Sequence, residues 1–183
     1  MRPFFAPGSE VAPVDVPPHG FAPVRELLSV EFRPSLRLVG QASGQTEAQR
    51  AGKRYEARVW ERLESYCAAA FPGSQFFIGP WFEFRTMGEG LRRAQPDVML
   101  LRANHVLLCE IKAQHTTAAW WQLRELYEPL VRFHWPVHHV SVCEICNTFD
   151  ASVRLPEAVE LVRDFDELLA LSDSNYHVLP WRP

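Results

Sequence analysis

Two short apolar runs joined by a polar turn constrain the fold of this chain more than any other stretch. Residues 98–101 and 106–112 have the length and composition of β-strands, and residues 102–105 between them have the composition of a turn. Strands separated by so few residues pair as an antiparallel hairpin. Such a hairpin would bring Asp97, where the first strand starts, opposite the Glu110 end of the second.

The charged residues of this hairpin have a spacing that suits metal chemistry. Pro96 and Asp97 precede the first strand, and Glu110, Ile111 and Lys112 end the second. Because side chains alternate along a strand, Glu110 and Lys112 share one face. Two carboxylates beside an ammonium group are what metal-assisted phosphodiester hydrolysis requires. The alternative is a solvated ion pair at a strand end, but charges that follow a run such as Val-Leu-Leu-Cys are costly unless they have a role.

The composition is that of a globular protein without general affinity for nucleic acid. The 183 residues carry a net charge of −3, so attraction to DNA would need local clusters of cations. Two clusters exist, and for each the alternative is a solvated face balanced by nearby glutamates: Arg50, Lys53, Arg54, Arg58 and Arg62; and Arg85, Arg92, Arg93 and Arg102. We expect a cytoplasmic protein, since no apolar run is long enough for a membrane span or a signal peptide.

The chain divides into three predicted parts. Residues 1–45 form a proline-rich extended N-terminal arm, because seven prolines in the first 34 residues disfavour a central strand or a long helix. A short helical turn is expected within this arm at 24–30. Residues 46–150 form the core, and residues 151–183 form a C-terminal helix and tail packed on it.

A helix is predicted from Thr46 to Ala70, with Glu56 in an unexpected position. On a helical wheel, Glu56 lies in the middle of an apolar stripe formed by Gly52, Val59, Trp60, Leu63, Cys67 and Ala70. A carboxylate there is costly unless it is paired, protonated or bound to a metal. Glu56 is therefore a third candidate acid.

The other elements are predicted from apolar periodicity and from breaker residues. Thr116 or Thr117 caps a helix that runs to Phe133, with Ala119, Leu123, Leu126, Leu130 and Phe133 as its apolar residues and with a kink or early end at Pro129. We predict strands at 75–78, 81–85 and 137–146, a mobile loop at 86–95, and a helix at 156–171 that buries Val159, Val162, Phe165, Leu168 and Leu169.

With these residues in place, the chain resembles the PD-(D/E)XK nuclease superfamily over roughly residues 46–147. The resemblance implies an α/β (α+β) restriction-endonuclease-like core, αβββαβ, with a central mixed sheet of four or more strands flanked by helices. It also implies that Asp97, Glu110 and the Ile111 carbonyl bind Mg²⁺ or Mn²⁺ and that Lys112 orients water or stabilises the transition state. Glu56 matches an additional first-helix carboxylate that several branches carry.

The helix after Lys112 resembles the RecB-type and phage-exonuclease branches, which carry a glutamine and a tyrosine about one turn apart. Gln122 and Tyr127 fill these roles, although their spacing of five is wider than the usual pattern. The supporting or DNA-contacting candidates are Gln114, Gln122, Tyr127, Arg92, Arg93 and Lys53.

Cysteine and histidine chemistry is the main competing interpretation. Cys143 and Cys146 form a CxxC, but on a strand these positions point to opposite faces and do not easily share a zinc ion. We expect reduced thiols, no zinc and no redox role. No iron–sulfur cluster is expected either, because the RecB-type pattern needs three cysteines near the C-terminus. His115, His134, His138 and His139 are expected to be surface or hydrogen-bonded residues, and the Trp120–Trp121 pair to pack in the core.

Two functions remain open. The first is a metal-dependent DNA nuclease for repair, recombination or phage DNA processing, in a bacterial cell or phage-infected host. The second is a non-catalytic nucleic-acid-binding or assembly protein that keeps the nuclease fold. In either case DNA is the expected partner, and the N-terminal arm would contact a protein partner or a second copy.

Overall fold

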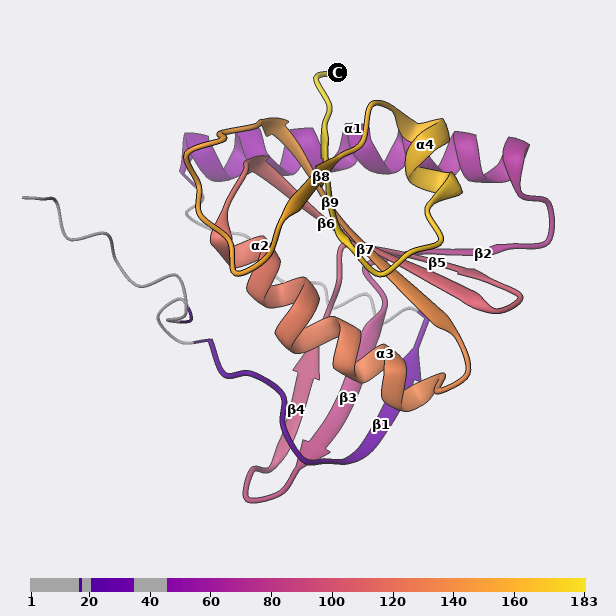
Figure 1. Cartoon of the computed structure of the whole chain (residues 1–183), viewed down its shortest axis with the longest axis vertical. Coiled ribbons are helices and arrows are strands. Elements are labelled where there is room, and N and C mark those ends of the chain that lie inside the picture. The colour runs from indigo at the N-terminus through magenta and orange to yellow at the C-terminus, as the bar shows by residue number, and fades with distance from the viewer. Residues whose placement is uncertain (1–16, 18–20, 35–45) are drawn as a thin grey trace, which may run out of the picture.

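The computed structural model describes residue 17 and residues 21–34 and 46–183 (Figure 1). Its elements are β1 (Leu27–Arg33), α1 (Glu47–Ala70), β2 (Gln75–Ile78), β3 (Trp81–Thr86), β4 (Leu91–Ala94), β5 (Val98–Arg102), β6 (His105–Gln114), α2 (Thr117–Gln122), the π-helical turn η1 (Leu123–Tyr127), α3 (Glu128–His134), β7 (His139–Thr148), β8 (Val159–Leu161), α4 (Phe165–Ala170) and β9 (Tyr176–Pro180).

A mixed sheet of six strands organises the molecule. Its strand order is β2-β5-β6-β7-β9-β8. The first three strands pair antiparallel, and β6, β7, β9 and β8 pair parallel. The predicted hairpin is confirmed as β5–β6, and the predicted strand after the second helix is confirmed as β7. The expected class, a mixed α/β fold with a multi-strand mixed sheet flanked by helices, is therefore correct.

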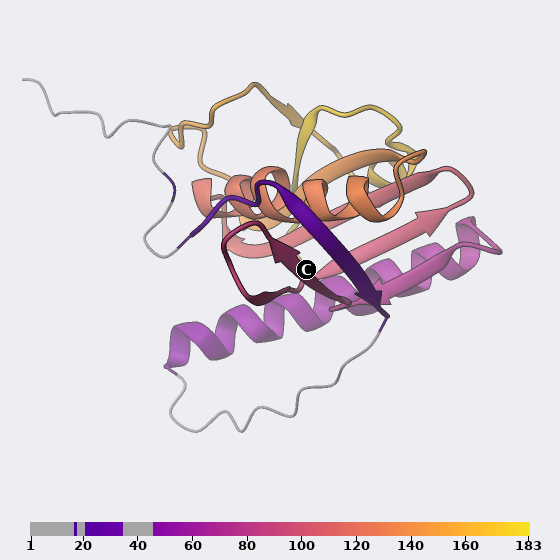
Figure 2. The ribbon, with the colours of Figure 1, turned by 90° about the horizontal axis from the view of Figure 1, so that it is seen from below.

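Helices cover both faces of this sheet. Figure 2 shows α1 on one side of the strands and α2–α3 on the other. The core divides accordingly, because side chains alternate along each strand. Cys109 and Ile111 of β6 pack with α1 and α4, whereas Val106 and Leu108 pack with α2, η1 and α3.

The first helix starts where its cap predicts. Thr46 and Gln49 form a reciprocal capping box at the N-terminus of α1. The buried residues of α1 are Tyr55, Val59, Leu63 and Cys67. Glu56 therefore lies at the margin of the buried stripe and is half-buried. Ala70, which was predicted to belong to the stripe, is exposed. The helical wheel placed Glu56 too close to the centre because it did not count Tyr55 as apolar.

The second helix contains a π-helical turn that the sequence pattern did not predict. Thr116 caps α2, and η1 separates α2 from α3, in whose first turn Pro129 lies. Proline lacks an N–H and clashes with the carbonyl of the preceding turn, so a wider turn just before it relieves the conflict. The extra residue rotates the last part of the helix, so that Val131 is buried while Phe133 is 45% exposed.

A separate three-stranded sheet, β1-β3-β4, corrects two predictions. The helical turn expected at 24–30 is wrong, because β1 pairs antiparallel with β3 there. The mobile loop expected at 86–95 is also wrong over its second half, where β4 pairs with the other edge of β3. In both cases pairing with β3 supplies backbone hydrogen bonds that local composition does not reveal. Most of the predicted N-terminal arm, residues 1–16, 18–20 and 35–45, lies outside the described residues.

The C-terminal region departs most from the prediction. The helix expected at 156–171 is wrong: residues 159–161 form β8, and only residues 165–170 are helical, as α4 capped by Asp164. β9, which was not predicted, inserts between β7 and β8. Val162, Phe165, Leu168 and Leu169 are buried as expected, and Val159 is partly buried. The apolar pattern thus predicted which residues are buried, but residues 159–161 form a strand because they pair in parallel with β9.

All four cysteines are free, in keeping with the reduced thiols expected from their positions in helices and strands, and all four are buried. Among the described residues, no helix is both long and apolar enough to cross a membrane.

Candidate metal and phosphodiester site

The β5–β6 hairpin brings the two predicted acids together. Val98 pairs with Cys109, so Asp97 lies across from Glu110 on the same face of the sheet. The backbone N–H of Ile111 donates a 2.7 Å hydrogen bond to Asp97 Oδ2, which holds that carboxylate against the second strand. The convergence predicted from the hairpin is therefore confirmed.

Lys112 shares a face with Glu110, as strand alternation requires. Its Nζ lies 2.6 Å from Glu110 Oε1. The Glu110 carboxylate is almost fully buried, whereas the lysine side chain is 28% exposed and faces outward. Burial lowers the pKa of Lys112, but the charges of Glu110 and Asp97 outweigh this and raise it, so the ammonium stays protonated.

The second oxygen of Glu110 is unsatisfied. Glu110 Oε2 is buried and no described residue donates a well-formed hydrogen bond to it, although the nearby backbone N–H of Asp97 acts on the carboxyl and lowers its pKa. Buried polar atoms of folded proteins almost always have a partner, and an exception indicates strain or a missing ion or water. This oxygen is placed as a metal ligand would be.

A neighbouring glutamate shows what a structural carboxylate looks like in the same environment. Glu144 of β7 pairs in register with Glu110 and is also fully buried. Glu144 Oε2 contacts His115 Nδ1 at 2.7 Å and accepts from the Tyr176 hydroxyl at 3.1 Å, and Oε1 accepts from the Thr116 N–H at 3.1 Å. Both oxygens of Glu144 are thus occupied by the protein, whereas Glu110 keeps one oxygen free.

Burial and mutual repulsion hold the acids of this site toward their protonated forms. Burial, followed by the charge of Asp97, raises the pKa of Glu110 to about 8. Burial also raises the pKa of Asp97, against the opposing effects of the Ile111 N–H and of Lys112. A divalent cation would relieve both the desolvation and the repulsion.

Glu56 joins this group from α1. Burial, followed by the charge of Asp97, raises the pKa of Glu56, while Lys112 and Lys53 lower it. The side chain is therefore close enough to Asp97 and Lys112 to interact with both. With all groups ionised, three carboxylates would face the ammonium of Lys112, an excess of negative charge that favours a cation.

The π-helical turn resolves the unusual spacing of Gln122 and Tyr127. A π turn closes hydrogen bonds between residues five apart, so these two side chains share a face. Gln122 Nε2 lies 3.3 Å from the Tyr127 hydroxyl, which donates a 3.0 Å hydrogen bond to the carbonyl of Gln95. Burial and then the charges of Glu110 and Asp97 raise the pKa of Tyr127. Tyr127 therefore braces the backbone just before Pro96.

A cleft of about 630 Å³ opens beside Lys112. It lies at the carboxyl ends of β6 and β7, between the first half of α1 and the start of α2. Its lining residues are Ala48, Ala51, Gly52, Tyr55, Lys112, Ala113, Gln114, Thr116, Asn147 and Thr148. The predicted residue Gln114 is thus beside the site, in the wall of this cleft.

The predicted cationic residues lie in different settings. Arg93 Nε pairs with Glu83 of β3 at 2.7 Å, and Arg92 Nη1 pairs with Glu89 of the β3–β4 turn at 2.7 Å, so both arginines of β4 have acidic partners nearby. Lys53 is exposed on α1, and its charge acts on Glu56. Lys53 was predicted only as a DNA contact, and the structure also places its charge close enough to Glu56 to lower the pKa of that carboxyl.

The cysteine pair does not meet on one side of the sheet. Cys143 packs in the core beside α1, and Cys146 packs in the core beside α2 and α3, as strand alternation predicts. Trp120 and Trp121 are both buried, and Trp120 Nε1 donates a 2.7 Å hydrogen bond to Glu157, so this pair belongs to the core rather than to an exposed base-stacking surface.

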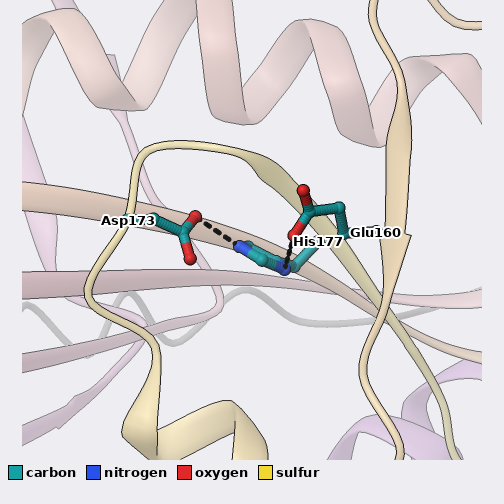
Figure 3. A group of neighbouring side chains, drawn as sticks. All are labelled: Glu160, Asp173 and His177. Carbon is teal, nitrogen blue, oxygen red and sulfur yellow. Dashed lines mark hydrogen bonds and ion pairs between the residues drawn. The ribbon is translucent and has the colours of Figure 1, made fainter.

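A second group of potential ligands lies at the other end of the sheet. Glu160 of β8 and His177 of β9 are register partners, and Asp173 precedes β9. Figure 3 shows the imidazole of His177 between the two carboxylates: Nε2 is 2.7 Å from Asp173 Oδ1, and Nδ1 is 3.9 Å from Glu160 Oε2. One ligand atom of each residue lies within 4.8 Å of the others, so by distance alone the three could share a cation. In the structure, each ring nitrogen of His177 instead faces one carboxylate. This arrangement is suited to joining β8 and β9.

Three features were not predicted from the sequence: the buried, fully hydrogen-bonded Glu144, the contribution of Gly52 to the cleft, and the Glu160–Asp173–His177 group. One signal was present for the first. The string Cys-Glu-Ile occurs at 109–111 and again at 143–145, and the two copies pair in register on β6 and β7. The other two sets depend on β9 and on the path of α1, which no local pattern reveals.

Comparisons of this chain with protein-family models, with curated proteins and with solved structures gave no match.

Proposed function

We propose that this chain is a deoxyribonuclease of the PD-(D/E)XK type that hydrolyses phosphodiester bonds with Mg²⁺ or Mn²⁺. The observation that carries the proposal is the free, buried Oε2 of Glu110 opposite Asp97, with Lys112 on its other oxygen. A purely structural acid in this position would be satisfied as Glu144 is.

The order of elements supports the same proposal. Helix α1, strands β2, β5 and β6, helices α2–α3 and strand β7 follow the αβββαβ order, with β6 and β7 parallel. The β3–β4 hairpin is an insertion between the first and second core strands. β9 and β8 extend the sheet beyond the core on its far side.

The donor set fits a hard divalent cation. Asp97, Glu110, Glu56 and the backbone carbonyl of Ile111 would hold the ion, and oxygen atoms are the ligands that Mg²⁺ prefers. When bound, the ion would neutralise phosphate charge and lower the pKa of a bound water. Lys112 places its ammonium where the phosphate gains negative charge, and the buried Glu110 prevents it from swinging away.

Tyr127 and the Ile111 N–H position the acids rather than the substrate. The first hydrogen-bonds the carbonyl of Gln95, and the second hydrogen-bonds Asp97 itself. Both contacts fix Asp97 at the start of β5. Such pre-organisation lowers the cost of assembling a charged site.

The test is a nuclease assay of the purified chain with Mg²⁺ or Mn²⁺ on linear, circular, single-stranded and branched DNA. We expect cleavage of at least one substrate, and a loss of about 100-fold or more in rate for Asp97→Ala and for Lys112→Ala. Isothermal titration should show divalent binding that Asp97→Ala abolishes.

Glu160→Ala is the matched control, because Glu160 belongs to the second group of potential ligands and is about half exposed. We expect this variant to keep wild-type cleavage and metal affinity. Absence of both cleavage and divalent binding in the wild-type chain would favour the non-catalytic DNA-binding or assembly role instead.

A further inference from the structure

The cleft beside Lys112 owes its open wall to one glycine. Gly52 is the sixth residue of the 24-residue helix α1, inside the helix, where glycine costs stability relative to alanine. An added Cβ at Gly52 would meet no atom within 4 Å. Packing within the described structure therefore does not require a glycine here, and Gly52 is itself part of the lining of the cleft.

The opposite wall presents polar groups without partners. The side chains of Gln114, Thr148 and Asn147 make no hydrogen bond to any other residue that the structure describes. They come from the carboxyl ends of β6 and β7, which is where open α/β sheets bind ligands. Amide and hydroxyl groups can both donate and accept, so this wall suits the edges of unpaired bases.

The size of the cleft favours a single strand over a duplex. Among the described residues that line it, Lys112 alone is charged, so the cleft offers polar groups to bases and little attraction to the phosphates of either form. The volume of about 630 Å³ falls within the range of about 300–1,000 Å³ typical of pockets for small ligands. A short unstacked segment of one strand matches it better than a double helix.

We propose that this cleft takes an unpaired stretch of DNA strand next to the catalytic residues, and that Gly52 keeps the cleft wide enough to admit it. This inference rests on the proposed nuclease function and adds its substrate class: DNA with a single-stranded end or gap. Blunt duplex DNA should then be a poor substrate.

The experiment measures binding and cleavage separately. Binding of a fluorescein-labelled single strand of about 10 nucleotides is followed by fluorescence anisotropy without metal, so that no hydrolysis occurs. A blunt hairpin duplex of the same composition is the comparison, at a fixed salt concentration of about 0.1 M. We expect the single strand to bind at least about tenfold more tightly than the duplex.

Gly52→Leu fills the cleft and should weaken single-strand binding by about tenfold or more. Ala69→Leu is the matched control, because it adds the same leucine to an exposed position of α1 outside the cleft. This control should stay within about threefold of the wild type. If circular dichroism shows that Gly52→Leu does not fold, Ala51→Leu, on the same wall, replaces it.

Failure of this inference is separable from failure of the proposed function. Unchanged single-strand binding in the cleft-filling variant, or equal affinity for the blunt duplex, overturns the cleft assignment even if Asp97-dependent cleavage is present. Conversely, if single-strand binding depends on Gly52 but no cleavage occurs with Mg²⁺ or Mn²⁺, the binding role of the cleft is supported and the proposed nuclease function is overturned.

Discussion

At the scale of single residues, Glu110 and Glu144 occupy equivalent places on neighbouring strands but have different surroundings. The protein occupies both oxygens of Glu144 with donors from His115, Thr116 and Tyr176. It leaves Glu110 Oε2 without one. Leaving a buried carboxylate oxygen unpaired costs stability, so the chain keeps a destabilised group at the position where a cation would stabilise it.

The raised pKa of Glu110 predicts how the stability of the metal-free protein depends on pH. The folded protein holds a proton on Glu110 up to a pKa of about 8, whereas the unfolded chain releases it near 4.5. The folded state therefore binds more protons between these values, and the free energy of unfolding falls as the pH rises through this window. Each pKa unit corresponds to about 1.4 kcal/mol, so the loss should be on the order of 5 kcal/mol, measured by urea denaturation at several pH values.

Glu110→Gln removes this titration and should flatten the pH dependence. The substituted protein should be more stable than the wild type above pH 8 without metal. Mg²⁺ at that pH should stabilise the wild type but have little effect on the variant, since ligand binding to the folded state alone raises stability. An equally steep pH dependence in Glu110→Gln would assign the effect to other groups.

At the scale of elements, two helical segments differ from an ideal α-helix: α1 contains a glycine in its interior, and η1 is a π-helical turn. Glycine at position 52 weakens α1 without any packing contact to explain it. The turn η1 contains one extra residue, and because of it Gln122 and Tyr127 meet on one face near Asp97. Departures of this kind tend to occur at functional sites, because function there outweighs local stability.

Gly52→Ala should stabilise the protein. The added methyl group meets no neighbour, and alanine loses less backbone entropy than glycine when a helix forms. We expect the free energy of unfolding to rise by about 0.5–1 kcal/mol, measured by chemical denaturation. A decrease would mean that position 52 has a contact or a backbone strain that the structure does not show.

At the scale of the whole molecule, the C-terminal residues complete the sheet rather than decorate it. β9 lies between β7 and β8, and its Tyr176 and Val178 are fully buried. His177 links Asp173 to Glu160 across the last two strands (Figure 3). The predicted core at 46–150 and the C-terminal part at 151–183, which was predicted to pack on it, share one six-stranded sheet.

A chain that ends at residue 150 should therefore not fold. It would lose β8, α4 and β9, and it would expose the edge of β7 and the buried faces against which Phe165 and Leu168 pack. We expect no cooperative thermal transition by circular dichroism and no nuclease activity. A cooperative transition in this fragment would restore residues 46–150 as an independent unit.

Local pattern determined much of this protein. A short turn determined the β5–β6 hairpin, and a capping box determined the start of α1. Strand alternation placed Glu110 and Lys112 on one face and separated Cys143 from Cys146. Each depends on neighbours close along the chain, where geometry is set by a few backbone dihedrals.

Only the tertiary structure decided the rest. Distant partners complete the backbone hydrogen bonds of β1 and β9, whose composition did not predict strands. β8 is a strand because it pairs with β9, although its composition favoured a helix. β4 pairs with the neighbouring strand β3, although its composition favoured a loop. The free oxygen of Glu110 and the satisfied oxygens of Glu144 differ for the same reason, since their partners come from elements remote in sequence. Long-range pairing and burial are properties of the assembled fold, so no window of sequence contains them.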